Sequence, residues 1–298
     1  MTMKDELKYK HLAEQAAREH RRERKIRTIA FLKRKSAAAA LLVLVLITLA
    51  AVFAPLVAPY PDQGKGAVNL GERLQPLSGK HLLGTDTFGR DILSRLVYGA
   101  RVSIFGGLFI VCAAALIGVP LGLWAGYSEG APGVVISRIG EILISFPAVL
   151  IAIAITTVIG AGLTSAVIAL IIPWWPWYAR IIQGEVLRLK RMLFVEAAQM
   201  LGYGKSYILF RHLLPNIMRT VMVMMLLDFG PAIISIGLLG FLGLGTQPPN
   251  ADWGLMVWEG APNLMQQPWI AISPGAAMFI LVMAFNIFGD NLQDYLDG

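Results

Sequence analysis

The stretch AAAALLVLVLITLAAVFAPLVA, residues 37–58, contains 22 residues without a charged side chain. A helix that crosses a bilayer needs about 20 predominantly apolar residues. Five further runs of this kind follow, and they cover residues 102–127, 138–160, 163–182, 217–245 and 270–290. The sequence therefore predicts an all-α, polytopic integral membrane protein with six transmembrane helices. Pro147 lies within the third run, and PWWPW at 173–177 is expected to break the fourth.

The composition favours the membrane class over a large soluble core. Apolar residues make up 56% of the chain and charged residues 15%, whereas soluble domains carry about 25% charged residues. Cys112 is the only cysteine, which excludes a disulfide or a cysteine-based zinc site within one chain. The histidines are scattered and no catalytic pair is recognisable, so neither a metal site nor an enzymatic activity is expected.

The distribution of basic residues predicts the orientation in the membrane. Residues 1–35 hold 12 Lys/Arg and 5 Asp/Glu. Because the basic tail directly precedes an apolar run, we expect it to bind an anionic leaflet or to set the membrane topology rather than to bind nucleic acid. Seven Lys/Arg lie between Arg180 and Arg219. Because cytoplasmic segments are enriched in Lys/Arg, both termini are expected in the cytoplasm.

These patterns divide the chain into four parts. They are a cytoplasmic basic tail (1–35), a first transmembrane anchor (36–58), an extracytoplasmic loop (59–100) and a core transmembrane domain (101–298). The anchor follows 35 polar residues and leads into sequence without a clear small-x-small site, so it is predicted to be retained rather than cleaved.

Glycines and tryptophans add expectations about packing. Gly118, Gly122 and Gly126 mark one face of the second apolar run, where close approach of a helix of the same chain is expected, with a dimer seam as the alternative. Tryptophans of the outer segment and of the PWWPW motif are expected at the membrane interfaces; they are Trp253, Trp258, Trp269, Trp174, Trp175 and Trp177.

The most regular polar interruption is VEAAQMLGYGKSYILFRHLLPN, residues 195–216. It predicts two short helices that are separated by Gly202 and Gly204, the second ended by Pro215, which disfavours helix at the residue before it. GKS at 204–206 resembles the end of a phosphate-binding loop, but that motif requires glycine where Gln199 stands. ATP binding by this chain is therefore not expected. An amphipathic loop on the headgroups is the alternative to a docking element.

The same residues resemble the EAA loop of the membrane subunits of bacterial ABC importers. The resemblance rests on Glu196-Ala197-Ala198, Gly202 and Leu214-Pro215, with His212 where the family commonly has an aliphatic residue. Three more blocks, 81–104, 239–256 and 274–297, are similar to the second (C-type) permease of dipeptide, oligopeptide and nickel importers. The resemblance implies a type I ABC importer permease fold in the cell inner membrane.

The resemblance also implies partners and roles. Residues at about 190–216 would be coupling helices that dock on one of two cytoplasmic ABC ATPase subunits, which would bind ATP and Mg²⁺; this chain would bind no cofactor. A homologous second permease would complete the path, and an extracytoplasmic binding protein would deliver peptides, with nickel or an oligosaccharide as alternative solutes. The expected coupling residues are Glu196, Ala197, Ala198, Gly202, Tyr203, His212, Leu214 and Pro215.

Four charged residues are candidates for the path or a gate. Asp228 lies in an apolar run, where an acid costs about 2.5–3.5 kcal/mol at the helix centre; it could line the path, pair for packing, or lie near the cytoplasmic end. Asp86–Arg90 and Asp91–Arg95 have the i, i+4 spacing of opposed pairs on a short helix. They could brace an outer gate or touch the partner permease, or form a solvated face.

Two other classes of function remain open from residues alone. A stand-alone ion-coupled carrier often shows internal repeats and charges at the midplane, but no convincing repeat is visible here. A membrane scaffold would use the polar strip only for docking.

Overall fold

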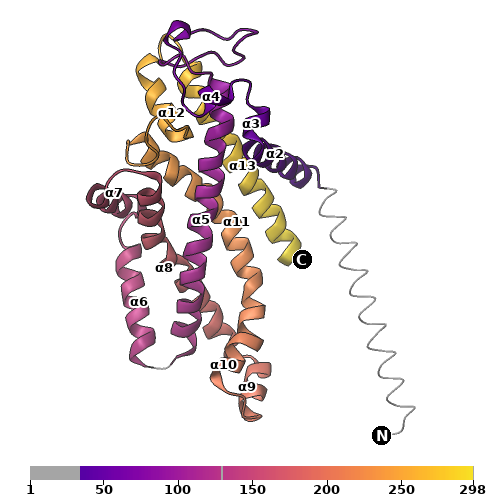
Figure 1. Cartoon of the computed structure of the whole chain (residues 1–298). Helices are drawn as coiled ribbons and strands as arrows, with labels where there is room; N and C mark the ends of the chain where they lie inside the picture. The colour runs from indigo at the N-terminus through magenta and orange to yellow at the C-terminus, as the bar shows by residue number, and fades with distance from the viewer. Residues whose placement is uncertain (1–33, 129, 298) are drawn as a thin grey trace.

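The computed structural model describes residues 34–128 and 130–297, so the basic tail lies almost wholly outside the described residues. The described part is a bundle of helices (Figure 1). The helices are α2 (Lys35–Val52), α3 (Ala54–Val57), α4 (Pro61–Gly64), η1 (Leu70–Glu72), α5 (Ile92–Tyr127), α6 (Ala131–Ile144), α7 (Ala148–Ile159), α8 (Leu163–Leu189), α9 (Leu193–Met200), α10 (Lys205–Tyr207), the π-helix η2 (Ile208–Leu213), α11 (Leu214–Phe241), α12 (Trp253–Gly260), η3 (Ala261–Asn263) and α13 (Trp269–Asp297).

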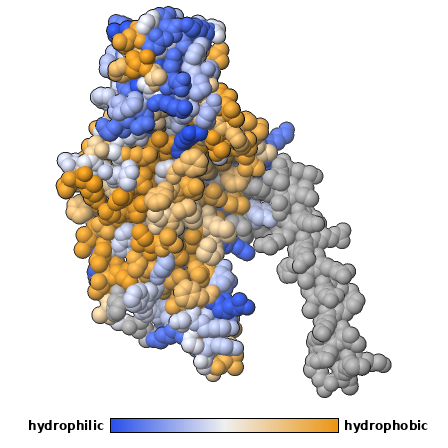
Figure 2. All heavy atoms as spheres, viewed as in Figure 1, coloured by the Kyte–Doolittle hydropathy of each residue, from blue (hydrophilic) through white to orange (hydrophobic). Residues whose placement is uncertain are grey.

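The apolar helices confirm the predicted membrane architecture. Within the described residues, α2, α5, α8, the continuous α10–η2–α11 unit and α13 are long and apolar enough to cross a bilayer. Figure 2 shows hydrophobic side chains over the middle of the visible face, with hydrophilic residues gathered at the end that carries α12. We call this the α12 end, and the opposite end, which carries α9, the α9 end.

The third predicted span is a bent pair of helices rather than one helix. α6 and α7 meet at an angle of 89°. The described residues therefore contain six candidate membrane spans only when this pair is counted as one span. Pro147 is the N-cap of α7, and a proline disfavours helical conformation at the residue before it. The break therefore falls at residues 145–147.

Two predicted boundaries are wrong. α5 begins at Ile92, ten residues before the apolar run, and reaches 36 residues, or about 54 Å at 1.5 Å per residue. α8 continues from Leu163 to Leu189 through both Pro173 and Pro176. Membrane helices tolerate proline when neighbouring helices satisfy the freed backbone groups, so PWWPW does not end this helix.

The glycine series on α5 serves packing within the chain, as predicted. A Cβ added at Gly118 would lie 2.4 Å from the Trp175 carbonyl oxygen, and one at Gly122 would lie 2.5 Å from that of Ala179. A Cβ at Gly126 would lie 2.7 Å from Cβ of Val186. Helices α5 and α8 can touch backbone to backbone only because these side chains are absent.

Substitution of Gly122 by valine is expected to lower the free energy of unfolding by about 1–3 kcal/mol, the usual cost of overpacking. Thermal unfolding of the detergent-solubilised protein measures the change. Gly184→Val on α8 is the control, because nothing lies within 4 Å of its added Cβ. Equal stability of both variants would contradict the assigned helix contact.

Candidate coupling and gating sites

The sequence strip at 195–216 forms a compact knob at the α9 end (Figure 1). We call residues 193–213 the α9 knob. Gly202 has φ +78°, a left-handed conformation that favours glycine. The Gly202 N–H donates to the Gln199 carbonyl (2.9 Å) and the Tyr203 N–H donates to the Ala198 carbonyl (3.2 Å). This pair of bonds is a Schellman cap, which fixes where α9 ends and how the chain turns back.

Helix α9 has one buried and one exposed face. Val195 and Ala198 are buried and pack with Ile208 and Leu213, whereas Glu196 and Ala197 are exposed. The expectation that Ala198 offers a small docking surface is wrong, because its three-residue spacing from Val195 places it on the inward face of the helix. Ala197 is exposed, as the predicted docking role requires, and it shares the exposed side with large apolar residues; these are Leu193, Met200 and Leu201, exposed by 75% or more.

An aromatic stack connects the two halves of the α9 knob. The rings of Tyr203 and Tyr207 are parallel with centroids 4.4 Å apart, and Tyr207 meets His212 edge-on at 5.5 Å. The ring of Phe194 on α9 lies 6.4 Å from that of His212. His212, the departure from the family pattern, thus adds an aromatic contact between η2 and α9 to the apolar packing of Ile208 and Leu213.

Pro215 does not end a helix, contrary to the expectation. It lies in the first turn of α11, which follows η2 without interruption. A proline has no N–H for the carbonyl four residues before it, and here the π-helix Ile208–Leu213 directly precedes the turn that holds Pro215. Because α10, η2 and α11 form one unit from Lys205 to Phe241, the α9 knob is built directly onto a membrane span.

At the α12 end, four charged side chains form what we call the buried charge cluster. Arg90 Nε lies 2.6 Å from Asp86 Oδ2, and Arg90 Nη2 lies 2.7 Å from Glu259 Oε2. Arg95 Nη2 donates to the same Glu259 oxygen at 3.1 Å. Both arginine side chains are at most 2% exposed. The cluster fastens the loop before α5 to α12.

This geometry corrects two expectations. Asp86 and Arg90 are neither exposed nor helical; they lie in a loop that turns at Gly89, where φ is +72°. Asp91 does not pair with Arg95. Its Oδ2 instead accepts the N–H of Ser94 at 2.8 Å and caps α5. Of the two predicted i, i+4 pairs, Asp86–Arg90 is confirmed, although a loop rather than a helix brings its members together, and Asp91–Arg95 is wrong because Asp91 is the N-cap of α5.

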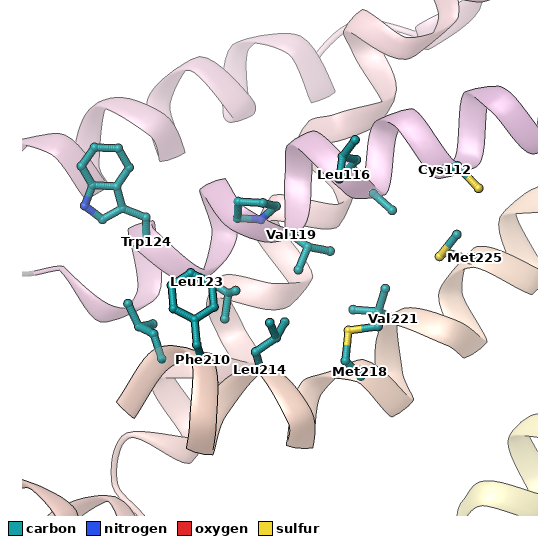
Figure 3. Close-up of a pocket in the computed structure, with 13 residues that line it drawn as sticks. Cys112, Leu116, Val119, Leu123, Trp124, Phe210, Leu214, Met218, Val221 and Met225 are labelled. Atoms are coloured by element: carbon teal, nitrogen blue, oxygen red, sulfur yellow. The ribbon is translucent and has the colours of Figure 1, made fainter. Parts of the chain in front are cut away.

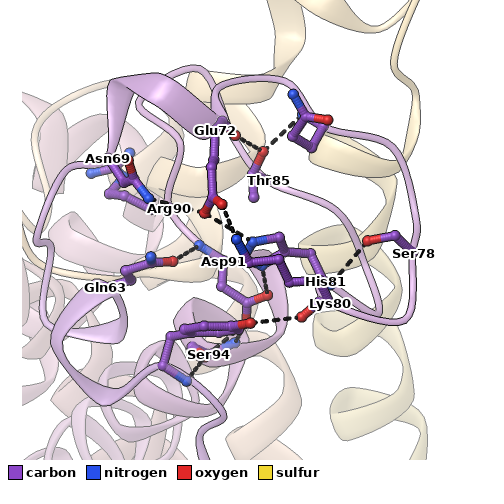
Figure 4. Close-up of polar contacts among 12 residues, drawn as sticks. Gln63, Asn69, Glu72, Ser78, Lys80, His81, Thr85, Arg90, Asp91 and Ser94 are labelled. Carbon is purple, nitrogen blue, oxygen red and sulfur yellow. Dashed lines mark hydrogen bonds and ion pairs between the residues drawn. The ribbon is translucent and has the colours of Figure 1, made fainter.

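A histidine completes the polar contacts of this end (Figure 4). His81 is 1% exposed, with Nδ1 2.9 Å from Asp91 Oδ1 and Nε2 3.3 Å from Glu72 Oε2. The hydrogen bond from Lys80 holds the pKa of Glu72 below its ordinary value. His81 could not be predicted as a positioning residue, because its partners Glu72 and Asp91 are not at helical spacing from it. Only the similarity of the segment 81–104 to the permease family pointed to this residue.

Helix α12 is held by a second acid that the sequence did not single out. Asp252 accepts the N–H groups of Gly254 (2.7 Å) and Leu255 (3.1 Å) and the hydroxyl of Thr246 (2.9 Å). Burial raises the pKa of Asp252, and these donors oppose the shift. The neighbouring Trp253 is buried and donates to the Leu96 carbonyl at 2.9 Å, so the expectation of an interfacial position is wrong for this tryptophan.

Asp228 lies in mid-helix rather than near an end of α11. It faces a cavity of about 390 Å³ that is bounded by the α6–α7 break and by Trp174 and Trp177 of α8. Its Oδ2 is buried and has no hydrogen-bond partner among the described residues. The polar groups of Tyr178 and Trp174 on α8 nevertheless interact with the carboxylate of Asp228, so the packing role and the path role both stay open.

A larger groove between α5 and α11 has a different character. It encloses about 580 Å³ and is lined by apolar side chains such as Leu116, Trp124 and Met218 (Figure 3). Nothing in it would orient a charged solute. Within the described residues no group of three or more His, Cys, Asp or Glu is arranged to hold a metal ion.

Apolar spans, a bent helix pair with a charged cavity, and a knob built onto a span define a membrane-embedded permease. Residues 118–298 match the family described as binding-protein-dependent transport system inner membrane component. The chain therefore belongs to this family and has the type I ABC importer permease fold. Residues 27–76 match the N-terminal transmembrane domain of oligopeptide transport permease C.

Curated relatives cover nearly the whole chain. The dipeptide transport system permease protein of Alkalihalophilus pseudofirmus is 40% identical over 265 residues, which is 89% of this chain and 86% of the relative. The glutathione transport system permease protein of Pectobacterium atrosepticum is 39% identical over 267 residues (90% and 88%). The protein of the same description from Escherichia coli O6:K15:H31 is 40% identical over 270 residues (90% and 88%).

Proposed function

We propose that this chain is the C-type permease subunit of an ATP-driven importer of peptides. The observation that carries the ATP-driven part is the α9 knob, which is exposed at its tip and continuous with α11. The peptide part rests on the dipeptide and glutathione permeases to which the chain is similar. A homologous permease completes the path, and an extracytoplasmic binding protein delivers the solute.

In this proposal the exposed face of α9 docks into a groove on a cytoplasmic ATPase subunit. ATP and Mg²⁺ are bound by the two ATPase subunits, and this chain binds no cofactor. When ATP binding closes the ATPases, Glu196 and Ala197 move with them. The Gly202 cap and the stack through His212 pass this displacement to Leu214, Pro215 and the rest of α11. The path then opens outward, and hydrolysis resets it.

The proposed orientation places the α9 end in the cytoplasm. Seven Lys/Arg lie between Arg180 and Arg219, in the last part of α8, the α9 knob and the first part of α11, and cytoplasmic segments are enriched in Lys/Arg. The buried charge cluster and α12 then lie on the extracytoplasmic side of the inner membrane. There the cluster braces the outer surface of the permease.

Reconstitution tests the proposal. The chain is co-expressed with the permease, ATPases and binding protein encoded beside it, and uptake of a radiolabelled dipeptide into proteoliposomes is measured with and without ATP. ATP-dependent uptake that needs all subunits supports the proposal. Uptake of nickel or an oligosaccharide instead would contradict the peptide assignment. Uptake by this chain alone on an ion gradient would contradict the importer assignment and favour a carrier.

A further inference from the structure

A polar cavity lies between α5 and the start of α8 at the α12 end. It encloses about 610 Å³ and is walled by the end of α4, the first three turns of α5, the first residue of α8 and the loop before α12. Its polar lining residues include Lys65, Arg101 and Gln247, and no acidic side chain is among the described residues that line it. The volume is within the range of about 300–1,000 Å³ that is usual for small-molecule sites. We call it the Arg101 cavity.

The ends of three apolar segments place the Arg101 cavity at the level of the lipid headgroups. The candidate span α2 ends at Val52, the candidate span α8 begins at Leu163, and the apolar run of α5 begins directly after Arg101. Arg101 touches the end of α2, since its Nε donates to the Ala51 carbonyl at 2.6 Å and its Nη2 donates to the Val52 carbonyl at 3.0 Å. Leu163 itself lines the cavity. The cavity therefore lies where these helices leave the hydrocarbon region of the bilayer.

Two cations come together at this cavity. Both belong to segments that touch the ring of Tyr98. The guanidinium carbon of Arg101 is 5.2 Å from the ring centroid, and Gly64, the residue before Lys65, has no room for a Cβ beside the same ring. Lys65 lies 4.0 Å from Asp62, and both side chains are exposed. Such an exposed pair is weak, so the positive charge of Lys65 remains available to a ligand.

The cavity also has hydrogen-bond donors to spare. A guanidinium group has five N–H donors, and the two carbonyls at the end of α2 use two of those of Arg101. Helix α8 begins at Leu163 without a side-chain cap, so its first N–H groups have no intrahelical partner and carry a partial positive charge. Tyr98, which lines the cavity, has a buried hydroxyl without a hydrogen-bond partner among the described residues. This combination suits an anion.

We propose that the Arg101 cavity binds the phosphate group of an anionic phospholipid. Arginine can hold two phosphate oxygens with parallel N–H bonds, Lys65 adds a second positive charge, and helix N-termini commonly bind phosphate groups. Basic pockets between membrane helices bind lipid headgroups. A lipid is favoured over an acidic protein segment because the apolar residues Val102 and Leu163 line the same cavity at the depth of the headgroups. In the orientation proposed above the lipid belongs to the outer leaflet, and its binding does not depend on peptide import.

Native mass spectrometry of the full chain in detergent, titrated with phosphatidylglycerol, tests the inference. Arg101→Gln is expected to weaken the apparent affinity for the tightest-binding phosphatidylglycerol about tenfold, the effect of losing one charge-assisted hydrogen bond. Lys65→Gln is expected to weaken it about threefold, because the charge that it removes is partly solvated. Arg101→Lys keeps the charge and is expected to lose less than Arg101→Gln. Lys65 is exposed, so its variant still tests the inference if Arg101→Gln disturbs the contact with α2.

Arg73→Gln is the matched control, because it removes an exposed cation of the same end that does not line the cavity. It is expected to bind phosphatidylglycerol like the wild type, and millimolar inorganic phosphate is expected to displace none of the lipid. Wild-type affinity in Arg101→Gln and Lys65→Gln would overturn the inference, as would an equal fall in Arg73→Gln. Displacement by inorganic phosphate would assign the cavity to a free anion instead. Loss of binding-protein association with unchanged lipid affinity would assign it to a protein contact.

Discussion

Ala197→Arg is expected to reduce ATP-driven peptide uptake by about 100-fold or more, while the chain still folds and inserts. Ala197 lies on the exposed face of α9, beside Glu196 and opposite the buried Val195. An arginine there meets solvent in the free chain, so folding is unaffected. In the proposed complex it meets the ATPase groove, and a desolvated, unpaired charge costs about 3–5 kcal/mol, which corresponds to a loss of at least 100-fold in affinity.

Three measurements separate obstruction from misfolding. Co-purification of the ATPase subunits reports docking, membrane content of the variant reports insertion, and uptake reports function. Ala197→Ser keeps a small side chain and is expected to retain uptake. Gln293→Arg adds the same charge at the exposed end of α13, and this variant is also expected to retain uptake. Normal uptake by Ala197→Arg would remove α9 from the docking surface.

Arg95→Gln is expected to lower the free energy of unfolding by about 3–5 kcal/mol, because it removes one partner of a buried ion pair. Arg95 is fully buried, and Glu259 accepts from both Arg90 and Arg95. Without Arg95, Asp86 and Glu259 face Arg90 alone, with two negative charges against one positive charge. The loop before α5 and helix α12 are then expected to separate at lower temperature.

Thermal unfolding in detergent measures this effect. The control Arg73→Gln changes an exposed residue of the same loop and is expected to stay within about 0.5 kcal/mol of the wild type. Arg95→Lys keeps the charge but loses the planar fork, so an intermediate stability is expected. A stability of Arg95→Gln equal to that of Arg73→Gln would show that the buried charge cluster does not fasten α12.

The sequence predicts the spans well because apolar length is a local property. It does not predict the bend of the third span, because Pro147 precedes a break whereas Pro173 and Pro176 lie inside the continuous helix α8. The buried charge cluster could not be predicted from spacing, because Glu259 lies 164 residues after Arg95 and only the fold brings them together. The continuity of η2 with α11 was missed for another reason: a proline usually ends a helix, and nothing local announces a π-turn before Pro215.

The predicted coupling residues also include positions that the motif specifies and positions whose exposure depends on packing. The motif alone predicts a coupling role for Glu196, Ala197 and Gly202, and the structure places them on an exposed helix and at its cap. The inward position of Ala198 depends on packing against Ile208 and Leu213, which no motif specifies. Asp228 was recognised as unusual from its apolar surroundings, but the cavity that it faces is created by the α6–α7 bend.

The uninterrupted helical unit from Lys205 to Phe241 determines how far a small tilt at one end displaces the other end. A helix of 37 residues is about 55 Å long. If it pivots about one end, a tilt of about 5° displaces the other end by about 5 Å, roughly the pitch of one helical turn. A small tilt of the helix end that lies outside the bilayer therefore changes which side chains the opposite half of the helix contacts.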